Sequence, residues 1–382
     1  MPAGGGAAAG ARGGPVPWQA PSRLLAIETG LANRTALGAG PSAPCPGSPA
    51  LSPVRSPKSS RLGGAGDAAP VPAPRAGHGP SEPAATARSG PATLLAVDGN
   101  ALVHRAFHGH ASASRGPLQG VATMLCAVVE QAAPQGVLVG FDGPPERSRR
   151  RERCPAYKAH RPATDPELRR LLGEAAAWLA ACGVTVVHGD GWEADDVVAS
   201  AARACEEAGW ACLIASSDRD VCGAVSEATT VLDFRRGVRH VQAITPRRLR
   251  RRPGVEPGQY VEYAALRGDP SDNLAGVPGI GSHRAAALLR AYASVDDAAA
   301  DELGLRSVLG SQPARGLRAD LDGGAEGSRF RRNVALMTLR RDLAVDVAAC
   351  RLASAAETVA AACESAGVPG VASRAAVALG AG

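Results

Sequence analysis

The sequence predicts an α/β fold with a parallel β-sheet core, followed by a mostly helical region. Between residues 93 and 244, short apolar runs that suit buried strands alternate with longer segments that suit helices. Several of these runs end at an aspartate, which is how a parallel sheet presents side chains at the carboxyl ends of its strands. From about residue 245 the pattern becomes helical.

Each expected strand is a short apolar run, and the expected helices lie between these runs. The strands are predicted at residues 93–97, 136–141, 184–187, 210–215 and 229–232, and the helices near 118–132, 165–181 and 194–208. Further helices are predicted at 260–267, 282–292 and 330–343. Residues 293–328 are rich in Ala, Asp and Gly and predict a poorly ordered, low-complexity insertion, and residues 346–382 predict a C-terminal tail.

Residues 1–92 consist mainly of Ala, Gly, Pro, Ser and Arg and show no sustained hydrophobic period. Such a segment cannot bury enough apolar surface to order itself, so we expect it to be disordered. It contains arginine and serine but few acids, which is typical of an organellar transit peptide followed by a linker. A plastid or mitochondrial location is therefore expected, and a biased tail on a nuclear or cytoplasmic protein is the alternative.

Composition excludes several classes of protein. Nine cysteines occur without a C-x-x-C pair, which argues against a zinc site or a disulfide framework. No segment reaches the roughly 20 apolar residues of a membrane span, so no membrane partner is expected. The formal net charge is +6 although acids are concentrated in a few clusters, and an acidic centre in a basic surface suits a polyanionic substrate.

Five acidic clusters between residues 98 and 272 are the strongest functional signal. Carboxylates gathered in one crevice repel each other unless some are protonated or metal ions lie among them. Hard divalent cations such as Mg²⁺ or Mn²⁺ prefer ligand sets made entirely of oxygen. The nine carboxylates are Asp98, Asp142, Glu193, Asp195, Asp196, Asp218, Asp220, Asp269 and Asp272.

Simpler explanations exist for some of these acids. Glu193, Asp195 and Asp196 open a predicted helix, where the helix dipole favours negative charge. One of Asp218 and Asp220 would suffice to cap the following helix, but two acids exceed what a cap requires. No G-x-S-x-G motif, Walker A motif or G-x-G-x-x-G after a strand is present, which removes hydrolase-triad, nucleotide-triphosphatase and dinucleotide interpretations.

Two further segments predict contacts with nucleic acid. Gly276-Val-Pro-Gly279-Ile-Gly281 before a predicted helix has the form of a helix–hairpin–helix, whose exposed backbone N–H groups attract phosphate. Many such turns are only turns, but this one directly follows two of the acids. In the second segment, Tyr157 stands beside Lys158 and near Arg161, and an aromatic ring between cations stacks a base while the cations bind phosphate. A basic run from Arg147 to Arg153 precedes this second segment. The alternative interpretation of this run is a charged surface exposed to solvent.

Taken together and in this order, the motifs resemble the 5′-nuclease family, which comprises flap endonucleases and the 5′→3′ exonuclease domain of bacterial DNA polymerase I. The resemblance covers roughly residues 93–292. It rests on Leu-Leu-Ala-Val-Asp98-Gly-Asn, Gly-Phe-Asp142, Tyr157-Lys158-x-x-Arg161, Glu193-Ala-Asp195-Asp196, Ser-Asp218-Arg-Asp220 and Gly-Asp269-Pro-Ser-Asp272-Asn273 with the glycine hairpin.

The resemblance implies a PIN-like core at 93–244 with a helical arch at about 145–180. It also implies a helix–hairpin–helix DNA-binding domain at 245–345, often with a bound K⁺. The nine carboxylates would then hold two Mg²⁺ ions, for which Mn²⁺ substitutes, and Asp196 and Asp269 are the two that equally suit a role beside the ligands. Tyr157, Lys158 and Arg161 would be catalytic. Residues matching DNA-binding positions are Arg150, Gly276, Gly279, Gly281, His283 and Arg284.

One departure concerns the hairpin, because His283 and Arg284 replace the family's usual lysine and small residue. The expected function is metal-dependent 5′→3′ exonuclease or structure-specific 5′ flap endonuclease action on DNA with a 5′ end or flap, in repair or replication. The two ions would lie about 4 Å apart. A stand-alone, monomeric nuclease is expected. The alternatives are a PIN-domain ribonuclease and a catalytically silent DNA-binding module.

Overall fold

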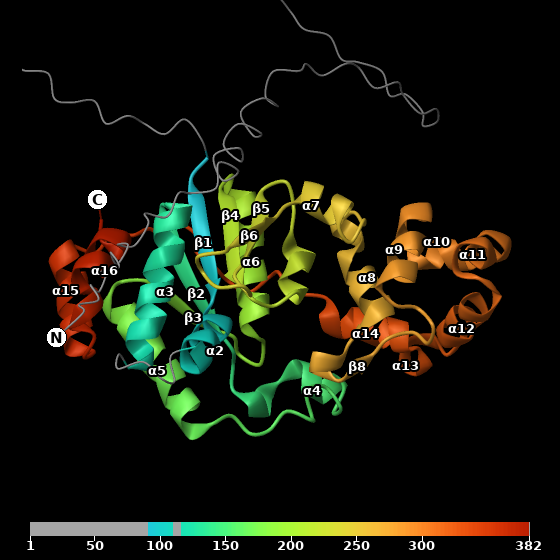
Figure 1. Cartoon of the computed structure of the whole chain (residues 1–382), viewed down its shortest axis with the longest axis horizontal. Coiled ribbons are helices and arrows are strands. Elements are labelled where there is room, and N and C mark those ends of the chain that lie inside the picture. The colour runs from blue at the N-terminus through green and yellow to red at the C-terminus, as the bar shows by residue number, and fades with distance from the viewer. Residues whose placement is uncertain (1–90, 110–115, 382) are drawn as a thin grey trace, which may run out of the picture. The chain divides into compact units, whose positions relative to one another are not determined.

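The computed structural model describes residues 91–109 and 116–381 (Figure 1). The expected transit peptide and linker fall almost wholly outside these ranges. Within them, no helix is both long enough and apolar enough to cross a membrane.

A six-stranded sheet forms the centre of residues 93–244, in the order β3-β2-β1-β4-β5-β6. All neighbouring strands are parallel except β5 and β6, which are antiparallel. The five predicted strands are confirmed to within a residue or two, whereas β6 is too short to leave a pattern. The bounds are β1 Thr93–Asp98, β2 Gly136–Phe141, β3 Thr185–His188, β4 Ala211–Ser216, β5 Thr229–Asp233 and β6 Gln242–Ile244.

Helices cover both faces of this sheet. Alternate residues of β1 point to opposite sides, so Leu94 packs in the cluster that includes α6 and Leu95 in the cluster that includes α2, α3 and α5. The helices at 117–132, 166–181 and 194–208 match the prediction, and α2 and α4 were not predicted. Their bounds are α2 Gly99–Gly109, α3 Pro117–Ala132, α4 Arg149–Arg153, α5 Pro166–Ala181 and α6 Ala194–Ala208.

The expected arch at about 145–180 is shorter in the structure. Leu168, Leu171 and Trp178 of α5 are buried in the core, so α5 belongs to the sheet layer. The connection at about 145–165, which contains α4, lies outside the sheet layer, although its Cys154 and Tyr157 are buried in the core (Figure 1). This connection carries Tyr157, Lys158 and Arg161 towards the carboxyl ends of the strands.

The region after residue 245 is helical, and the expectation of a poorly ordered insertion at 293–328 was wrong. Four helices form there; Leu305 and Leu309 of α11, and Ala314 and Leu317 of α12, recur at helical spacing within each helix and are buried, a pattern hidden by the surrounding Ala, Gly and Asp. The helices are α7 Pro246–Arg251, α8 Tyr260–Arg267, α9 Ser282–Ala291, α10 Val295–Ala300, α11 Glu302–Leu309, α12 Ser311–Asp322, α13 Gly324–Gly327 and α14 Arg329–Met337. A short antiparallel pair, β7 Gly268–Asp269 and β8 Leu274–Ala275, lies between α8 and α9.

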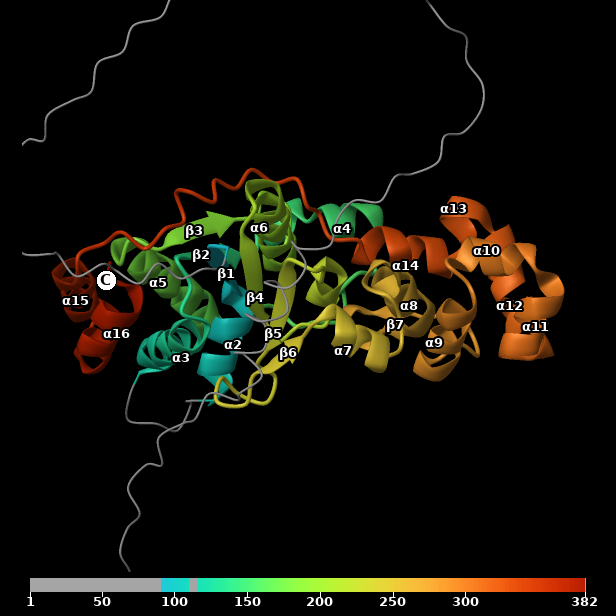
Figure 2. The ribbon, with the colours of Figure 1, turned by 90° about the horizontal axis from the view of Figure 1, so that it is seen from above.

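The last residues return to the core instead of forming a free tail. The N–H of Val137 donates to the Cys350 carbonyl at 2.9 Å, which ties this segment to β2. Beyond it, α15 (Ala356–Ser365) and α16 (Ala372–Leu379) pack together with α3 and α5 (Figures 1 and 2). Val359 and Leu379 are fully buried in the cluster on that face of the sheet.

Leu379 and Val377 of α16 provide a matched test of this packing. Leu379 is 0% exposed and Val377 is 83% exposed. Replacing Leu379 by Ala should lower the free energy of unfolding by about 2–5 kcal/mol because a core cavity forms. The change Val377→Ala should stay within about 0.5 kcal/mol of the wild type. Equal effects in denaturant titrations would show that α16 does not pack as described.

Candidate active site

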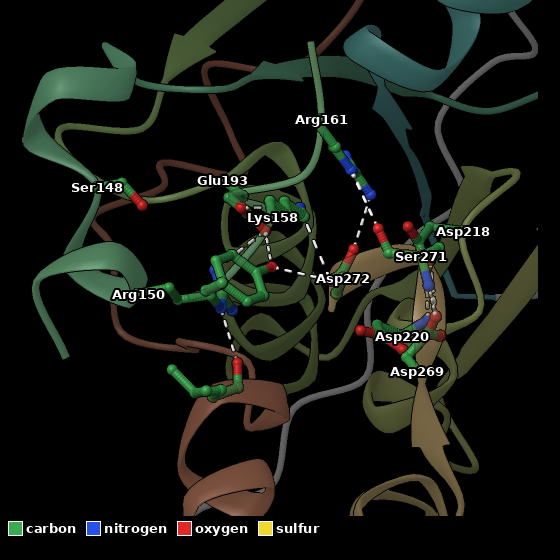
Figure 3. Close-up of polar contacts among 12 residues, drawn as sticks. Ser148, Arg150, Lys158, Arg161, Glu193, Asp218, Asp220, Asp269, Ser271 and Asp272 are labelled. Atoms are coloured by element: carbon green, nitrogen blue, oxygen red, sulfur yellow. Dashed lines mark hydrogen bonds and ion pairs between the residues drawn. The ribbon is translucent and has the colours of Figure 1, made fainter. Parts of the chain in front are cut away.

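Acidic side chains gather at one edge of the sheet, where three adjacent parallel strands end. Asp98 is the last residue of β1, Asp142 follows β2, and Asp218 lies two residues beyond β4. The N-terminus of α6 adds Glu193 and Asp195. Figure 3 shows Asp218, Asp220 and Asp269 on one side, Glu193 on the other, and Asp272 between them. The predicted convergence of the acids is therefore present.

Asp98 is held rigidly at the centre of this edge. Its Oδ1 accepts from the N–H of Ala101 at 2.8 Å, and its Oδ2 accepts from Ser216 Oγ at 2.7 Å. Burial raises the pKa of Asp98 to about 7, and the negative charges of Asp142 and Asp218 add to this rise against the two hydrogen bonds.

Asp142 is positioned by Asn100, which the sequence analysis did not single out. Asn100 Nδ2 donates to Asp142 Oδ2 at 2.9 Å, and Asn100 Oδ1 accepts from the Asp142 N–H at 3.0 Å. Asp142 Oδ1 also accepts from the N–H of Ala194 at 2.8 Å, which joins β2 to the start of α6. Desolvation raises the pKa of Asp142, and nearby Glu193 contributes. The position of Asn100, two residues after Asp98, was a possible signal for this role.

Glu193 lies directly before α6 and receives hydrogen bonds from the connection that contains α4. Lys158 Nζ donates to Oε1 at 2.8 Å and the Tyr157 hydroxyl lies 3.0 Å from Oε2. Burial opposes ionisation of Glu193, but Lys158 and Arg150 outweigh it and lower the pKa of Glu193 below its usual value. Glu193 is therefore a carboxylate with two positive neighbours.

Asp272 is the second carboxylate bound by this connection. Arg161 Nη2 donates to its Oδ1 at 2.7 Å (Figure 3). The Tyr157 hydroxyl lies 3.0 Å from its Oδ2. Lys158 Nζ is 3.8 Å from the same Oδ2. Burial raises the pKa of Asp272 in spite of these cations. Tyr157 and Lys158 thus lie between Glu193 at the start of α6 and Asp272 after α8, and Arg161 adds a second cation at Asp272.

Asp195, Asp218 and Asp220 lie near one another, and none of them pairs with a cation among residues 91–109 and 116–381. Burial and the charges of Asp218 and Asp98 raise the pKa of Asp195 well above its usual value. Burial, together with Asp218 and Asp272, raises the pKa of Asp220 to about 8. Asp220 Oδ1 is buried and has no hydrogen-bond partner. An unpartnered oxygen among like charges is a position that a bound cation would stabilise.

Asp269 makes hydrogen bonds within its own turn. Its Oδ1 accepts from both the N–H and the hydroxyl of Ser271, at 2.8 and 2.7 Å. Arg267 Nη2 lies 3.6 Å from its Oδ2. The carboxylate shapes the turn that places Asp272, and it contributes negative charge to the surroundings of Asp220.

The predicted roles of Asp196 in metal binding and of Arg150 in DNA binding require correction, because these two side chains form a buried ion pair below the site. Asp196 is 0% exposed, and its Oδ1 accepts from Arg150 Nη2 and from the N–H of Arg340, both at 2.8 Å. Its Oδ2 accepts from Arg150 Nη1 and from the N–H of Glu193. Arg150 Nε donates to the Leu336 carbonyl at 2.7 Å. Asp196 has no free oxygen for a metal, and the buried guanidinium of Arg150 is not available to DNA.

The remaining carboxylates fit divalent cations by their chemistry, although they are not drawn tightly together. Across residues 91–109 and 116–381, no three His, Cys, Asp or Glu side chains are close enough to form a preformed metal site. Asp98, Asp142 and Asp218 each accept a hydrogen bond from a backbone N–H group instead, and Asp220 Oδ1 keeps no partner among the described residues. The donor set contains only oxygen, and the raised pKa values of Asp98 and Asp220 reflect charge that a cation would neutralise.

The glycine hairpin adjoins Asp272 and precedes α9. A Cβ atom on Gly276 would lie 2.3 Å from the Arg267 carbonyl oxygen, so only glycine fits there. Gly279 has a φ of +79°, and a Cβ on Gly281 would meet no atom within 4 Å. Arg284 Nη1 donates to the Gly279 carbonyl at 2.8 Å, and the exposed His283 precedes it. The hairpin is thus present as predicted, with its Gly279 carbonyl already bonded to a cationic side chain.

Two family models match consecutive parts of the chain. Residues 93–254 match the 5′–3′ exonuclease N-terminal resolvase-like domain, and residues 255–358 match the 5′–3′ exonuclease C-terminal SAM fold.

Related proteins include DNA polymerase I of Mycobacterium tuberculosis, which is 35% identical over 259 residues, or 66% of this chain and 27% of that protein. DNA polymerase I of Thermus thermophilus is 36% identical over 53% of this chain and 24% of that protein. The chain therefore spans about a quarter of the length of these relatives.

Among solved structures, zinc-bound T5 5′-exonuclease aligns over 75% of this chain and 99% of its own, with a TM-score of 0.53 and 20% identity. A T5 flap endonuclease complex with DNA and metal ions aligns over 75% of this chain and 98% of its own, with a TM-score of 0.52 and 20% identity. These similarities support the predicted fold, a parallel sheet core followed by a helical domain. The two consecutive domain matches and the resemblance read from the motifs agree, and the chain belongs to the 5′–3′ exonuclease family.

Proposed function

We propose that this protein is a metal-dependent 5′→3′ exonuclease or 5′ flap endonuclease that hydrolyses phosphodiester bonds of DNA. The observation that carries the proposal is the acidic edge of the sheet, which meets Lys158, Arg161 and the glycine hairpin in one place. Acids suit metal binding, whereas cations and exposed N–H groups suit a phosphate backbone. The relatives are named for DNA synthesis or 5′ nuclease activity, which supports DNA as substrate.

We propose two groups of metal ligands. Asp98, Asp142, Glu193 and Asp195 would hold one Mg²⁺, and Asp218, Asp220 and Asp272 would hold a second, with Mn²⁺ able to replace either. Such ions, when bound, activate water and stabilise the oxygen that leaves the phosphorus. A K⁺ at the hairpin is less well supported, because Arg284 already bonds the Gly279 carbonyl.

The chain's own residues would position the substrate and compensate charge. Lys158 and Arg161 currently neutralise Glu193 and Asp272, and both cations are near enough to be shared with a phosphate bound among these acids. Tyr157 is buried at 3% exposure and lies between the same two carboxylates. It would fix their separation and exclude water from that side of the site.

Location, pathway and assembly are further proposals. We propose a plastid or mitochondrial location from the composition of residues 1–92, and a monomer acting in DNA repair or replication. Cleavage of a 5′-labelled DNA flap, compared with single-stranded RNA of the same sequence, would test the activity itself. Mg²⁺-dependent products from the DNA flap are expected. Exclusive cleavage of the RNA would favour a PIN-domain ribonuclease, and absence of cleavage with retained binding would favour a silent DNA-binding module.

Neighbouring Asp195 and Asp196 should respond differently to the same substitution. Asp195→Asn should abolish cleavage while flap binding in Ca²⁺ and the free energy of unfolding are retained, because it removes one metal ligand. Asp196→Asn should destabilise the fold by about 3–5 kcal/mol, because Arg150 would remain buried without its partner. Cleavage assays and denaturant unfolding of both variants provide the measurement. An active Asp195→Asn protein would contradict the proposed ligand set.

Replacing Lys158 tests the proposed role of the positive side chains at the acidic site. Lys158→Ala should lower the single-turnover rate at saturating enzyme by roughly 10²–10³-fold, as expected when one electrostatic stabiliser is removed. The control is Arg306→Ala, since Arg306 is exposed on α11 outside the acidic site. If Lys158 only adds to a solvated surface, its loss would weaken DNA binding slightly and leave the rate unchanged.

The raised pKa of Asp220 predicts a pH-dependent stability. The pKa of this carboxyl is about 8 in the folded protein, against about 3.9 when unfolded, so the folded state retains a proton that the unfolded state loses. The stability of metal-free protein should therefore fall as pH rises from 5 to 8. Asp220→Asn should flatten this fall, and Mg²⁺ should raise the melting temperature of the wild type more at pH 8 than at pH 5. A variant with the same pH profile as the wild type would contradict the assignment.

A further inference from the structure

Ser216 carries a buried hydroxyl group that contacts both proposed groups of metal ligands. It is the last residue of β4 and is 0% exposed. Its Oγ donates to Asp98 Oδ2 at 2.7 Å and accepts from the N–H of Asp218 at 3.0 Å. Asp98 belongs to the first proposed group and Asp218 to the second, so this one side chain lies between the two groups. Ser216 was not among the site residues predicted from the sequence.

The direction of both hydrogen bonds of Ser216 follows from the chemistry of its partners. An N–H group can only donate, so the Asp218 N–H occupies a lone pair of the hydroxyl oxygen. The single hydroxyl proton therefore points to Asp98 Oδ2. Because Asp98 Oδ1 accepts from the N–H of Ala101 at 2.8 Å, each oxygen of this carboxylate has its own donor. These two donors fix the plane of the carboxylate and leave further lone pairs for a cation.

The turn after β4 is held by the same residue. The Ser216 carbonyl accepts from the N–H of the buried Phe234 at 3.3 Å, which ties the end of β4 to the residue after β5. Within the turn, Asp218 Oδ1 accepts from the N–H of Asp220 at 2.9 Å. A chain of hydrogen bonds therefore runs from Asp98 on β1 through the Ser216 hydroxyl to Asp218 and Asp220.

We propose that Ser216 is a positioning residue that holds Asp98 and the turn bearing Asp218 at a fixed separation, and so supports both proposed Mg²⁺ sites. The proposal rests on the proposed function, because it takes the two ligand groups from there. Loss of the hydroxyl would leave Asp98 Oδ2 and the Asp218 N–H without this partner at a position closed to water. A buried polar group without a partner is costly, so the carboxylate or the turn would move towards another partner.

The test measures Mn²⁺ binding to the full chain by electron paramagnetic resonance of the free ion. In Ser216→Ala, the affinity of both sites should fall by about 10–100-fold, as is typical when a hydrogen-bonding neighbour of a metal ligand is removed. A substitution that removes a ligand of one group, such as Asp220→Asn, should instead affect mainly one site. Ser216→Cys fills a similar space with a weak donor and should show the same double loss. Ser216→Thr keeps the hydroxyl and should restore most of the affinity.

Ser200→Ala is the matched control for loss of a buried hydroxyl. Ser200 is 1% exposed, and its Oγ donates to the Asp196 carbonyl at 2.7 Å and accepts from the N–H of Leu343 at 3.2 Å. These partners are backbone groups and not proposed ligands. The control should therefore retain the wild-type affinity for Mn²⁺ at both sites. Melting temperatures of the metal-free proteins establish that each variant is folded before Mn²⁺ is added.

Three results would overturn the positioning role of Ser216 even if the wild type cleaves a DNA flap. They are wild-type affinity at either site in folded Ser216→Ala or Ser216→Cys, an equal loss of affinity in Ser200→Ala, and no recovery of affinity in folded Ser216→Thr. If the wild type binds two Mn²⁺ ions and both sites depend on Ser216 as expected, but no flap is cleaved, only the proposed nuclease activity fails.

Discussion

Repulsion between carboxylates at the carboxyl edge of the sheet is the constraint on which the rest of the site depends. Parallel strands β1, β2 and β4 bring Asp98, Asp142 and Asp218 to one edge because their directions agree. Burial then raises the pKa values of Asp98 and Asp220 to about 7 and about 8. The proposed chemistry requires several negatively charged oxygens in one place. Bound cations would remove the repulsion between these oxygens.

Positive side chains compensate the negative charge of the carboxylates in two different ways. Arg150 pairs permanently with the fully buried Asp196, which fixes the start of α6 and the segment after α14 beneath the site. Lys158 pairs with Glu193 at the surface of the site, where a phosphate and metal ions can compete for either partner. The first pair therefore holds the structure together, and under the proposed function the second pair would exchange partners when a substrate phosphate binds.

The strands, the acidic edge and the hairpin were predictable because each leaves a strong local pattern. An apolar run ending in Asp, such as β1 with Asp98, predicts both the strand and the acidic side chain at its carboxyl end. The buried ion pair of Asp196 with Arg150 was not predictable, since adjacent acids in a first turn look alike until the burial of Arg150 is known. The helices at 295–327 and 356–379 were missed because Ala, Gly and Asp obscure the few leucines and valines that anchor them.

The proposed binding of two divalent cations at this acidic edge is tested most directly by the number of Mn²⁺ ions bound per chain. Electron paramagnetic resonance of free Mn²⁺ during a titration at pH 8 would measure this number. We expect two saturable sites in the wild type and the loss or marked weakening of one in Asp220→Asn. Absence of saturable binding, or unchanged binding of two ions in Asp220→Asn, would contradict it.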